Sequence, residues 1–141
     1  MRVIAGEFRS RRLKSLPGLN TRPTPDRLRE TLFNVLASRI AGCVFVDVYA
    51  GTGAVGIEAL SRGARRAIFI EKSRAAVDVI RENLSSLGLP SRAEVLNSQA
   101  ATVLERTRAD IARPQVHRVS TRDRARTDEL SRRVRRKFGP G

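Results

Sequence analysis

The sequence predicts an α/β fold with an open parallel sheet, and two observations lead to this prediction. Between residues 43 and 110, short apolar runs of strand-forming residues alternate with helical stretches that carry one apolar face. A glycine-rich turn from Gly51 to Gly56 joins the first of these strands to the helix that follows it. Strand and helix alternate three times, which predicts parallel strands connected by right-handed crossovers.

The first 40 residues precede this alternation. Residues Arg2 to Ala5 favour a short strand that turns at Gly6, and Pro17-Gly18 marks a second turn. A helix is expected next, with Thr24 as its cap, Pro25 in its first position and Asp26 at the positive end of its dipole. Apolar residues then recur at steps of three and four, which predicts one buried face made of Leu28, Leu32, Val35, Leu36 and Ile40.

Three strand–helix pairs follow along the chain. Continuous apolar strands are typical of a buried parallel sheet, and Gly63 and Gly88 are placed to end the first two helices. Ser73 is expected to cap the second helix, whose apolar face contains Ala76, Val77, Ile80, Leu84 and Leu87. The expected strands are 43–46, 67–70 and 93–96, and the expected helices are 53–62, 73–87 and 101–108.

Charge divides the chain into three parts. Residues 1–40 form a basic extension and helix of net charge +6, residues 41–110 form a cofactor-binding core of net +1, and residues 111–141 form an Arg-rich tail of net +7. The tail carries no sustained period and is expected to be disordered. Basic ends around a neutral core favour a polyanionic partner, although biased coding is the alternative for the tail.

The remaining features of the composition concern membrane spans, disulfides and metal sites. The sequence contains no apolar run of about 18 residues, the length that a membrane span needs. The single cysteine, Cys43, opens an expected strand and is read as a small core residue. The single histidine, His117, has no partner at metal-ligand spacing, so no metal site is expected. We therefore expect a cytoplasmic monomer without a membrane partner.

The glycine turn and two carboxylates form the candidate cofactor site. Gly51, Gly53 and Gly56 let a ligand approach backbone N–H groups closely, and Glu71 ends the second strand, where it can bind ribose hydroxyls. Asp47 ends the first strand, four residues before Gly51. A carboxylate there would repel the pyrophosphate of a dinucleotide but suits a cationic sulfonium, which favours S-adenosylmethionine. A dinucleotide site, or an Asp47 that only caps the turn, are the alternatives.

Longer stretches of the sequence resemble a known family. The head Met1-Arg2-Val3-Ile4-Ala5-Gly6, the segment Thr21 to Asn34, and the loop and helix from Asp47 to Ala64 are similar to the RsmD-type methyltransferases. The resemblance covers residues 1–110 and implies a Rossmann-like fold, S-adenosylmethionine as cofactor, and methylation of the exocyclic N2 of a guanine in small-subunit (16S) ribosomal RNA. It implies these cofactor-binding residues: Asp47, Ala50, Gly51, Thr52, Gly53, Glu71 and Gln99. Gln99 departs from the family, which has an Asp on the adenine side at this position.

The carboxy-terminal part departs from that family. The family's Asp/Asn-Pro-Pro-Tyr/Phe motif, which orients the target amine, should follow residue 110, but the sequence has no adjacent prolines. We therefore assign no catalytic residue, and the switch to Arg-rich text is typical of a shifted frame or a truncated product. The missing motif predicts that this chain has lost methyl-transfer activity. The alternatives are a DNA adenine-N6 methylase and an inactive, basic RNA-binding remnant.

Two further groups of residues carry predictions. Tyr49, inside the glycine loop, is expected either to pack under the ligand or to join the core. Arginines are dense in the amino-terminal part, ahead of the neutral core, and such density favours contact with RNA phosphates over a merely solvated surface. The candidate RNA-binding residues are Arg9, Arg11, Arg12, Arg22 and Arg27.

Overall fold

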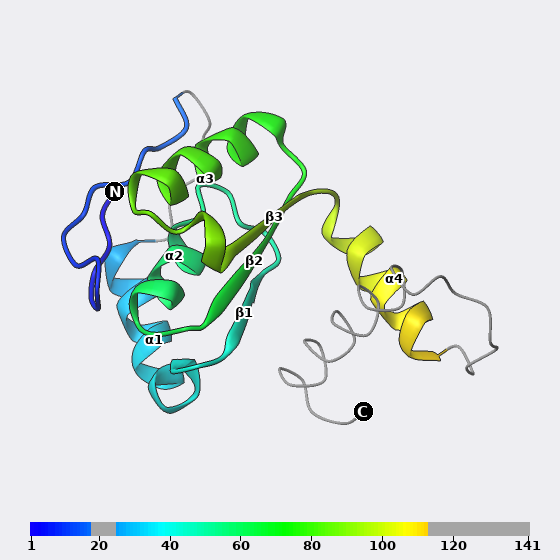
Figure 1. Cartoon of the computed structure of the whole chain (residues 1–141), viewed down its shortest axis with the longest axis horizontal. Coiled ribbons are helices and arrows are strands. Elements are labelled where there is room, and N and C mark those ends of the chain that lie inside the picture. Colours follow the sequence, from blue (N-terminus) through cyan, green and yellow to red (C-terminus); the bar gives the residue numbers. More distant parts are fainter. Residues whose placement is uncertain (18–24, 113–141) are drawn as a thin grey trace. The chain divides into compact units, whose positions relative to one another are not determined.

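The structure is a computed structural model of the chain, and it describes residues 1–17 and 25–112 (Figure 1). It divides into two units, Met1–Ser98 and Gln99–Gly141. The first unit contains the sheet with its helices, and the described part of the second is one helix. The first two residues of the predicted tail, 111 and 112, belong to this helix, and the rest of the tail, with His117, lies outside the described residues.

The first unit is built on a three-stranded parallel sheet in the order β1-β2-β3. Val46 of the first strand pairs with Ile68 of the second, and Phe69 pairs with Val95 of the third. The sheet confirms the predicted α/β fold and parallel topology. The strands are β1 (Val44–Asp47), β2 (Arg66–Glu71) and β3 (Ala93–Asn97), and the helices that join them are α2 (Ala54–Ser61) and α3 (Arg74–Ser86), with a 3₁₀ turn at Pro90–Arg92.

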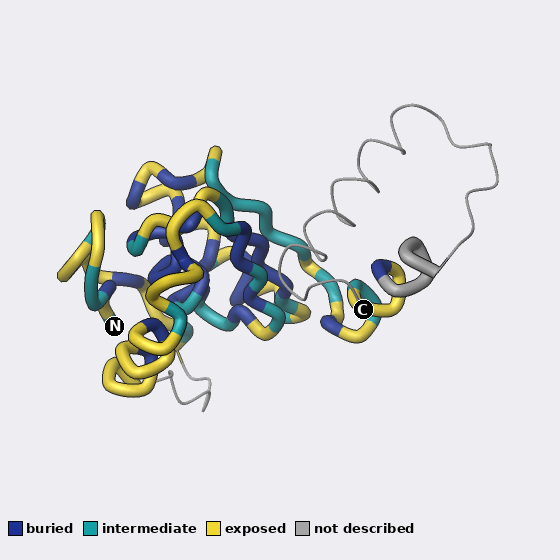
Figure 2. Tube along the Cα trace, turned by 90° about the horizontal axis from the view of Figure 1, so that it is seen from below, coloured by how far each residue is buried: buried dark blue, intermediate teal, exposed yellow. Residues whose placement is uncertain are grey.

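Phe69 of β2 is fully buried beneath helices α2 and α3. A Cβ at Gly56 on α2 would lie 2.3 Å from the Phe69 ring. A Cβ at Gly53 would lie 3.2 Å from Ile80 of α3 and 3.4 Å from the same ring. Glycines at these positions therefore let both helices approach the sheet closely. Phe69 belongs to the buried core of the first unit, and Figure 2 colours the chain by burial.

The helix caps follow the sequence prediction in part. The Ser73 hydroxyl accepts a hydrogen bond from the Ala76 amide at 3.4 Å, as expected for the start of α3. All five apolar positions predicted for its inner face are buried. In contrast, Pro25 itself stands at the cap position of α1 without a side-chain cap, and Thr24 lies outside the described residues.

The amino-terminal segment, residues 1–14, is packed onto the core as a tight hairpin. Its only ladder pairing is an isolated antiparallel bridge between Arg2 and Arg12, so the predicted strand from Arg2 to Ala5 is wrong. The Val3 amide donates to the Arg11 carbonyl, and the Leu13 amide donates to the Met1 carbonyl. Val3 and Leu13 are buried in the same core as the sheet. These two buried side chains therefore attach the segment to the core.

Helix α1 (Asp26–Ile40) buries only part of the predicted face. Ile40 is buried and Leu36 packs against the core, as predicted. Leu28, Leu32 and Val35 are 57%, 39% and 77% exposed, so the prediction that they are buried is wrong. Arg29 and Phe33 are buried in their place. At about 100° per residue the apolar residues of α1 cover a wide arc, and only one side of that arc meets the core.

Two aromatic contacts fix which side of α1 faces inward. The Phe33 ring lies 6.0 Å from the Phe45 ring of β1, and the Arg62 guanidinium lies 5.1 Å from the Phe33 ring centroid. The Arg29 guanidinium donates to the Arg2 carbonyl at 2.8 Å and to the Asp26 carboxylate at 2.6 Å. The amino-terminal segment and α1 are therefore joined through a buried arginine.

Helix α4 (Ala100–Ala112) is the described part of the second unit, and it is longer than the predicted 101–108. Across the described residues, none of the helices combines the length and the apolar character that a bilayer crossing requires. Side chains of α4 are described as far as Thr107, which is buried and donates to the Val103 carbonyl at 2.8 Å.

Candidate cofactor site

The glycine loop turns at the carboxyl end of β1, where parallel sheets of this kind place their ligands. Gly51 and Gly53 adopt φ angles of 55° and 81°, in the left-handed region that favours glycine. The Gly53 amide closes the turn by donating to the Ala50 carbonyl at 2.7 Å. A Cβ added to Gly51 would meet nothing within 4 Å, so the space beside this backbone is open. A ligand can therefore approach the loop there.

Asp47 supports the loop from its buried side. Its Oδ2 accepts a hydrogen bond from the Gly56 amide, in the first turn of α2, at 3.0 Å. A carboxylate at a helix amino terminus is favourable because the free amides and the helix dipole are positive there. This contact agrees with the alternative in which Asp47 caps the turn. Its predicted action on the cofactor stays a prediction.

Glu71 joins the loop to the start of α3. Its Oε2 accepts from the Gly51 amide at 2.9 Å, and its Oε1 accepts from the Ser73 amide at 2.8 Å. Each carboxylate oxygen has two lone-pair directions, so both can accept a further hydrogen bond from ribose hydroxyls. Asn97, at the end of β3, donates to the backbone carbonyls of Glu71 and Lys72 at 3.0 Å each. The carboxyl ends of all three strands are thus tied together.

Asn83 on α3 is a loop contact that the sequence analysis missed. Its side chain is 1% exposed, and its amide nitrogen donates to the Thr52 carbonyl at 3.1 Å. The signal was available, because Asn83 lies three residues after Ile80 on the apolar face of its helix. A polar residue at such a position needs buried hydrogen-bond partners.

The structure also shows where four other residues from the sequence predictions lie. Ala50 is buried beneath the loop. Tyr49 is 85% exposed, so the expectation that it joins the core is wrong. Gln99 is exposed and is the first residue of the second unit, where its carbonyl accepts from the Val103 amide at 3.3 Å. Cys43 is half-buried and packs against the core, as expected of a small core residue.

The predicted RNA-binding arginines lie on the amino-terminal segment and on α1. Arg9, Arg11, Arg12 and Arg27 are all exposed, and Arg22 lies outside the described residues. Arg11 also donates to the Ser86 carbonyl on α3 at 3.3 Å. The described residues contain no group of three His, Cys, Asp or Glu side chains that could hold a metal ion.

Comparisons with known proteins agree with this arrangement. The model of a family described as "Conserved hypothetical protein 95" matches residues 1–116. The chain is 44% identical over 104 residues to the Ribosomal RNA small subunit methyltransferase D of Escherichia coli K12, covering 74% of this chain and 52% of the relative. It is 40% identical over 106 residues to the protein of the same name from Haemophilus influenzae, covering 74% and 55%.

The chain is also similar to a solved structure. The Escherichia coli protein yhhF superposes with a TM-score of 0.67 at 41% identity, covering 74% of this chain and 55% of that one. The chain therefore spans about half the length of the curated relatives that it matches.

Proposed function

The chain belongs to the family of the RsmD-type methyltransferases. From that premise we propose that its function is the transfer of a methyl group from S-adenosylmethionine to the exocyclic N2 of a guanine in small-subunit ribosomal RNA. The observation that carries the proposal is the site itself. A glycine loop with two left-handed residues stands at the carboxyl edge of a parallel sheet, and it is held by carboxylates at the ends of two neighbouring strands.

The loop suits the methyl donor in shape and in charge. The open space at Gly51 leaves room for a ligand against the backbone, and the Glu71 carboxylate beside it is proposed to accept hydrogen bonds from the ribose hydroxyls. Asp47 and Glu71 make this edge negative, which favours a cationic sulfonium and opposes a pyrophosphate. In the proposal Asp47, Ala50, Gly51, Thr52 and Gly53 surround the methionine part. The resemblance alone supports Gln99 as an adenine contact.

When bound, S-adenosylmethionine supplies an electrophilic methyl group on sulfur, and the protein's share is to align an amine lone pair with it. The target guanine has to leave its stack for this alignment. Contacts to the RNA phosphates, which fix the position of the substrate but do not select its sequence, are proposed for the five candidate arginines, Arg9, Arg11, Arg12, Arg22 and Arg27.

The sequence lacks the motif that orients the amine in the family. We therefore propose that the chain of 141 residues binds the cofactor and RNA but does not methylate RNA at a useful rate. A tritiated-methyl assay on under-methylated small subunits, run beside a variant that carries a relative's carboxy-terminal half, tests this. Equal turnover by the two proteins would refute it.

Calorimetry tests the cofactor directly. We expect S-adenosylmethionine or its demethylated product, S-adenosylhomocysteine, to bind and NAD not to bind. Preferential binding of NAD would overturn the proposed function in favour of a dinucleotide site.

A further inference from the structure

The glycine loop needs an anchor that its own sequence does not provide. Thr52 stands between Gly51 and Gly53, and glycine loses more conformational freedom on folding than any other residue. A loop that must be ordered as the ligand binds lowers affinity by the cost of that ordering. A contact that holds the Thr52 backbone in place before the cofactor binds should therefore raise cofactor affinity.

Asn83 is the side chain that fixes it. Its amide nitrogen donates to the Thr52 carbonyl and to the Lys14 carbonyl, each at 3.1 Å. Its Oδ1 accepts from the Lys14 amide at 2.7 Å. A buried primary amide thus connects three stretches of chain that are far apart in sequence, with both its nitrogen and its oxygen occupied.

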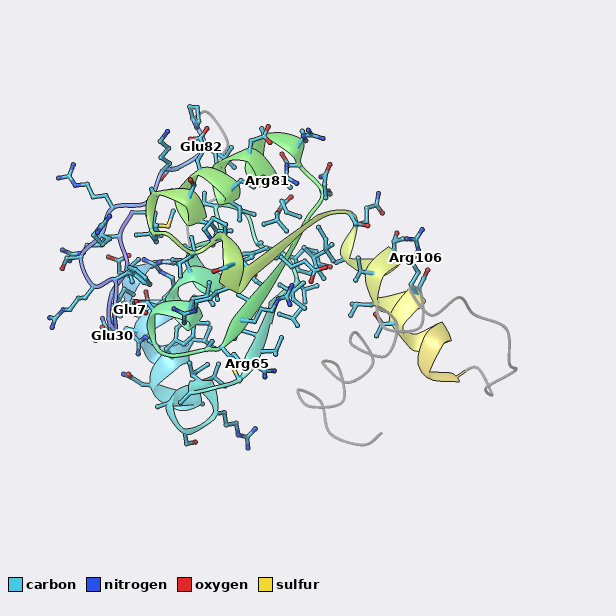
Figure 3. All side chains as sticks on the ribbon, viewed as in Figure 1. Glu7, Glu30, Arg65, Arg81, Glu82 and Arg106 are labelled. Carbon is cyan, nitrogen blue, oxygen red and sulfur yellow. The ribbon has the colours of Figure 1, made fainter. Side chains whose placement is uncertain are left out.

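The amino-terminal segment is the other half of this anchor. Leu13 is buried next to Lys14, and the Lys14 ammonium lies 2.6 Å from the Glu82 carboxylate on α3, which Figure 3 labels. At the other end of the segment, the Thr52 hydroxyl donates to the Met1 sulfur at 3.8 Å. Residues 1–14 therefore contact the loop directly and also through Asn83.

We propose that Asn83 is a positioning residue for the cofactor: by holding Thr52 and Lys14 together, it makes the amino-terminal segment part of the cofactor site. The inference rests on the proposed function, because the loop is taken as the place where S-adenosylmethionine binds. It adds a residue outside the glycine motif. It also assigns the segment that carries Arg9, Arg11 and Arg12 a second task besides contact with RNA.

The test compares two ways of loosening the same segment in the whole chain. Asn83→Ala removes the link to the loop. Ser61→Ala is the matched control, because the Ser61 hydroxyl also makes two hydrogen bonds to this segment, with the Ala5 carbonyl at 2.6 Å and the Phe8 amide at 2.9 Å, at the far end of α2 from the loop. Asn83→Asp keeps the size of the side chain but places a carboxylate oxygen against the Thr52 and Lys14 carbonyls. This variant replaces Asn83→Ala in the test if the alanine variant does not fold.

Three quantities are measured for each variant: the Kd for S-adenosylhomocysteine, the melting temperature, and amide hydrogen exchange of residues 50–57 without ligand. We expect the Asn83 variants to bind about 2- to 30-fold more weakly and to exchange faster in the loop. Ser61→Ala should lower the melting temperature but leave both loop quantities unchanged.

Wild-type affinity in Asn83→Ala, or an equal loss in Ser61→Ala, would overturn the inference. If the wild-type chain binds no S-adenosylhomocysteine, the proposed function fails. The exchange comparison then still decides whether Asn83 holds the loop.

Discussion

A methyl group added at Gly56 tests the packing beneath the glycine loop. In Gly56→Ala the new Cβ would lie 2.3 Å from Cε1, 2.7 Å from Cζ and 3.0 Å from Cδ1 of Phe69. Three contacts at or below 3.0 Å cannot be accommodated without movement, and the ring they meet is fully buried rather than a flexible chain end. Gly56 belongs to α2, so the alanine backbone itself is not strained.

The expected magnitude follows from two opposing contributions. Overpacking a core costs about 1–3 kcal/mol, whereas alanine in a helix interior gains about 0.5–1 kcal/mol over glycine. The approach of 2.3 Å to a fully buried ring places the overpacking cost in the upper half of its range, so the free energy of unfolding of Gly56→Ala should fall by about 1–2 kcal/mol. Urea denaturation followed by far-ultraviolet circular dichroism measures this value.

A double-mutant cycle identifies the cause. If the clash with Phe69 is responsible, Phe69→Leu should cost less in the Gly56→Ala background than in the wild type, because the smaller side chain frees the space. A Gly56→Ala chain as stable as the wild type, or additive single changes, would refute the reasoning about close approach.

Three other predictions follow from described contacts. Glu71→Ala should weaken S-adenosylhomocysteine binding by about 1–3 kcal/mol, because the ribose loses an acceptor; calorimetry that shows unchanged affinity would contradict this. Val35→Gln on the exposed side of α1 should change unfolding free energy by less than about 0.5 kcal/mol, while Phe33→Ala should cost about 3–5 kcal/mol in the same denaturation assay. Replacing Arg9 and Arg12 by glutamine should reduce the salt slope of RNA binding by about one for each lost phosphate contact, and an unchanged slope in filter binding would count against the proposed surface.

The order of strands and helices in residues 43–108 follows from local patterns of the sequence. Apolar runs, the glycine turn and the Ser73 cap are local signals, since each depends on residues within a few positions of one another. The position of Glu71 at the end of β2 follows from the same reasoning, because parallel strands bring their carboxyl ends to one edge of the sheet.

Which residues of α1 are buried depends on tertiary packing and does not follow from its periodicity. The periodicity permits a face centred on Leu32 as well as one centred on Phe33. Phe33 is the buried residue because its ring contacts the Phe45 ring and the Arg62 guanidinium on that side of the helix.

The same holds for the attachment of residues 1–14. The buried Glu58 carboxylate accepts from the Ile4 and Ala5 amides at 2.8 Å and 3.0 Å, and Asn83 binds the Lys14 backbone. These partners lie more than 50 residues apart in sequence. A backbone amide carries no residue-specific signal, so its partner is determined only when packing brings a buried acceptor to it.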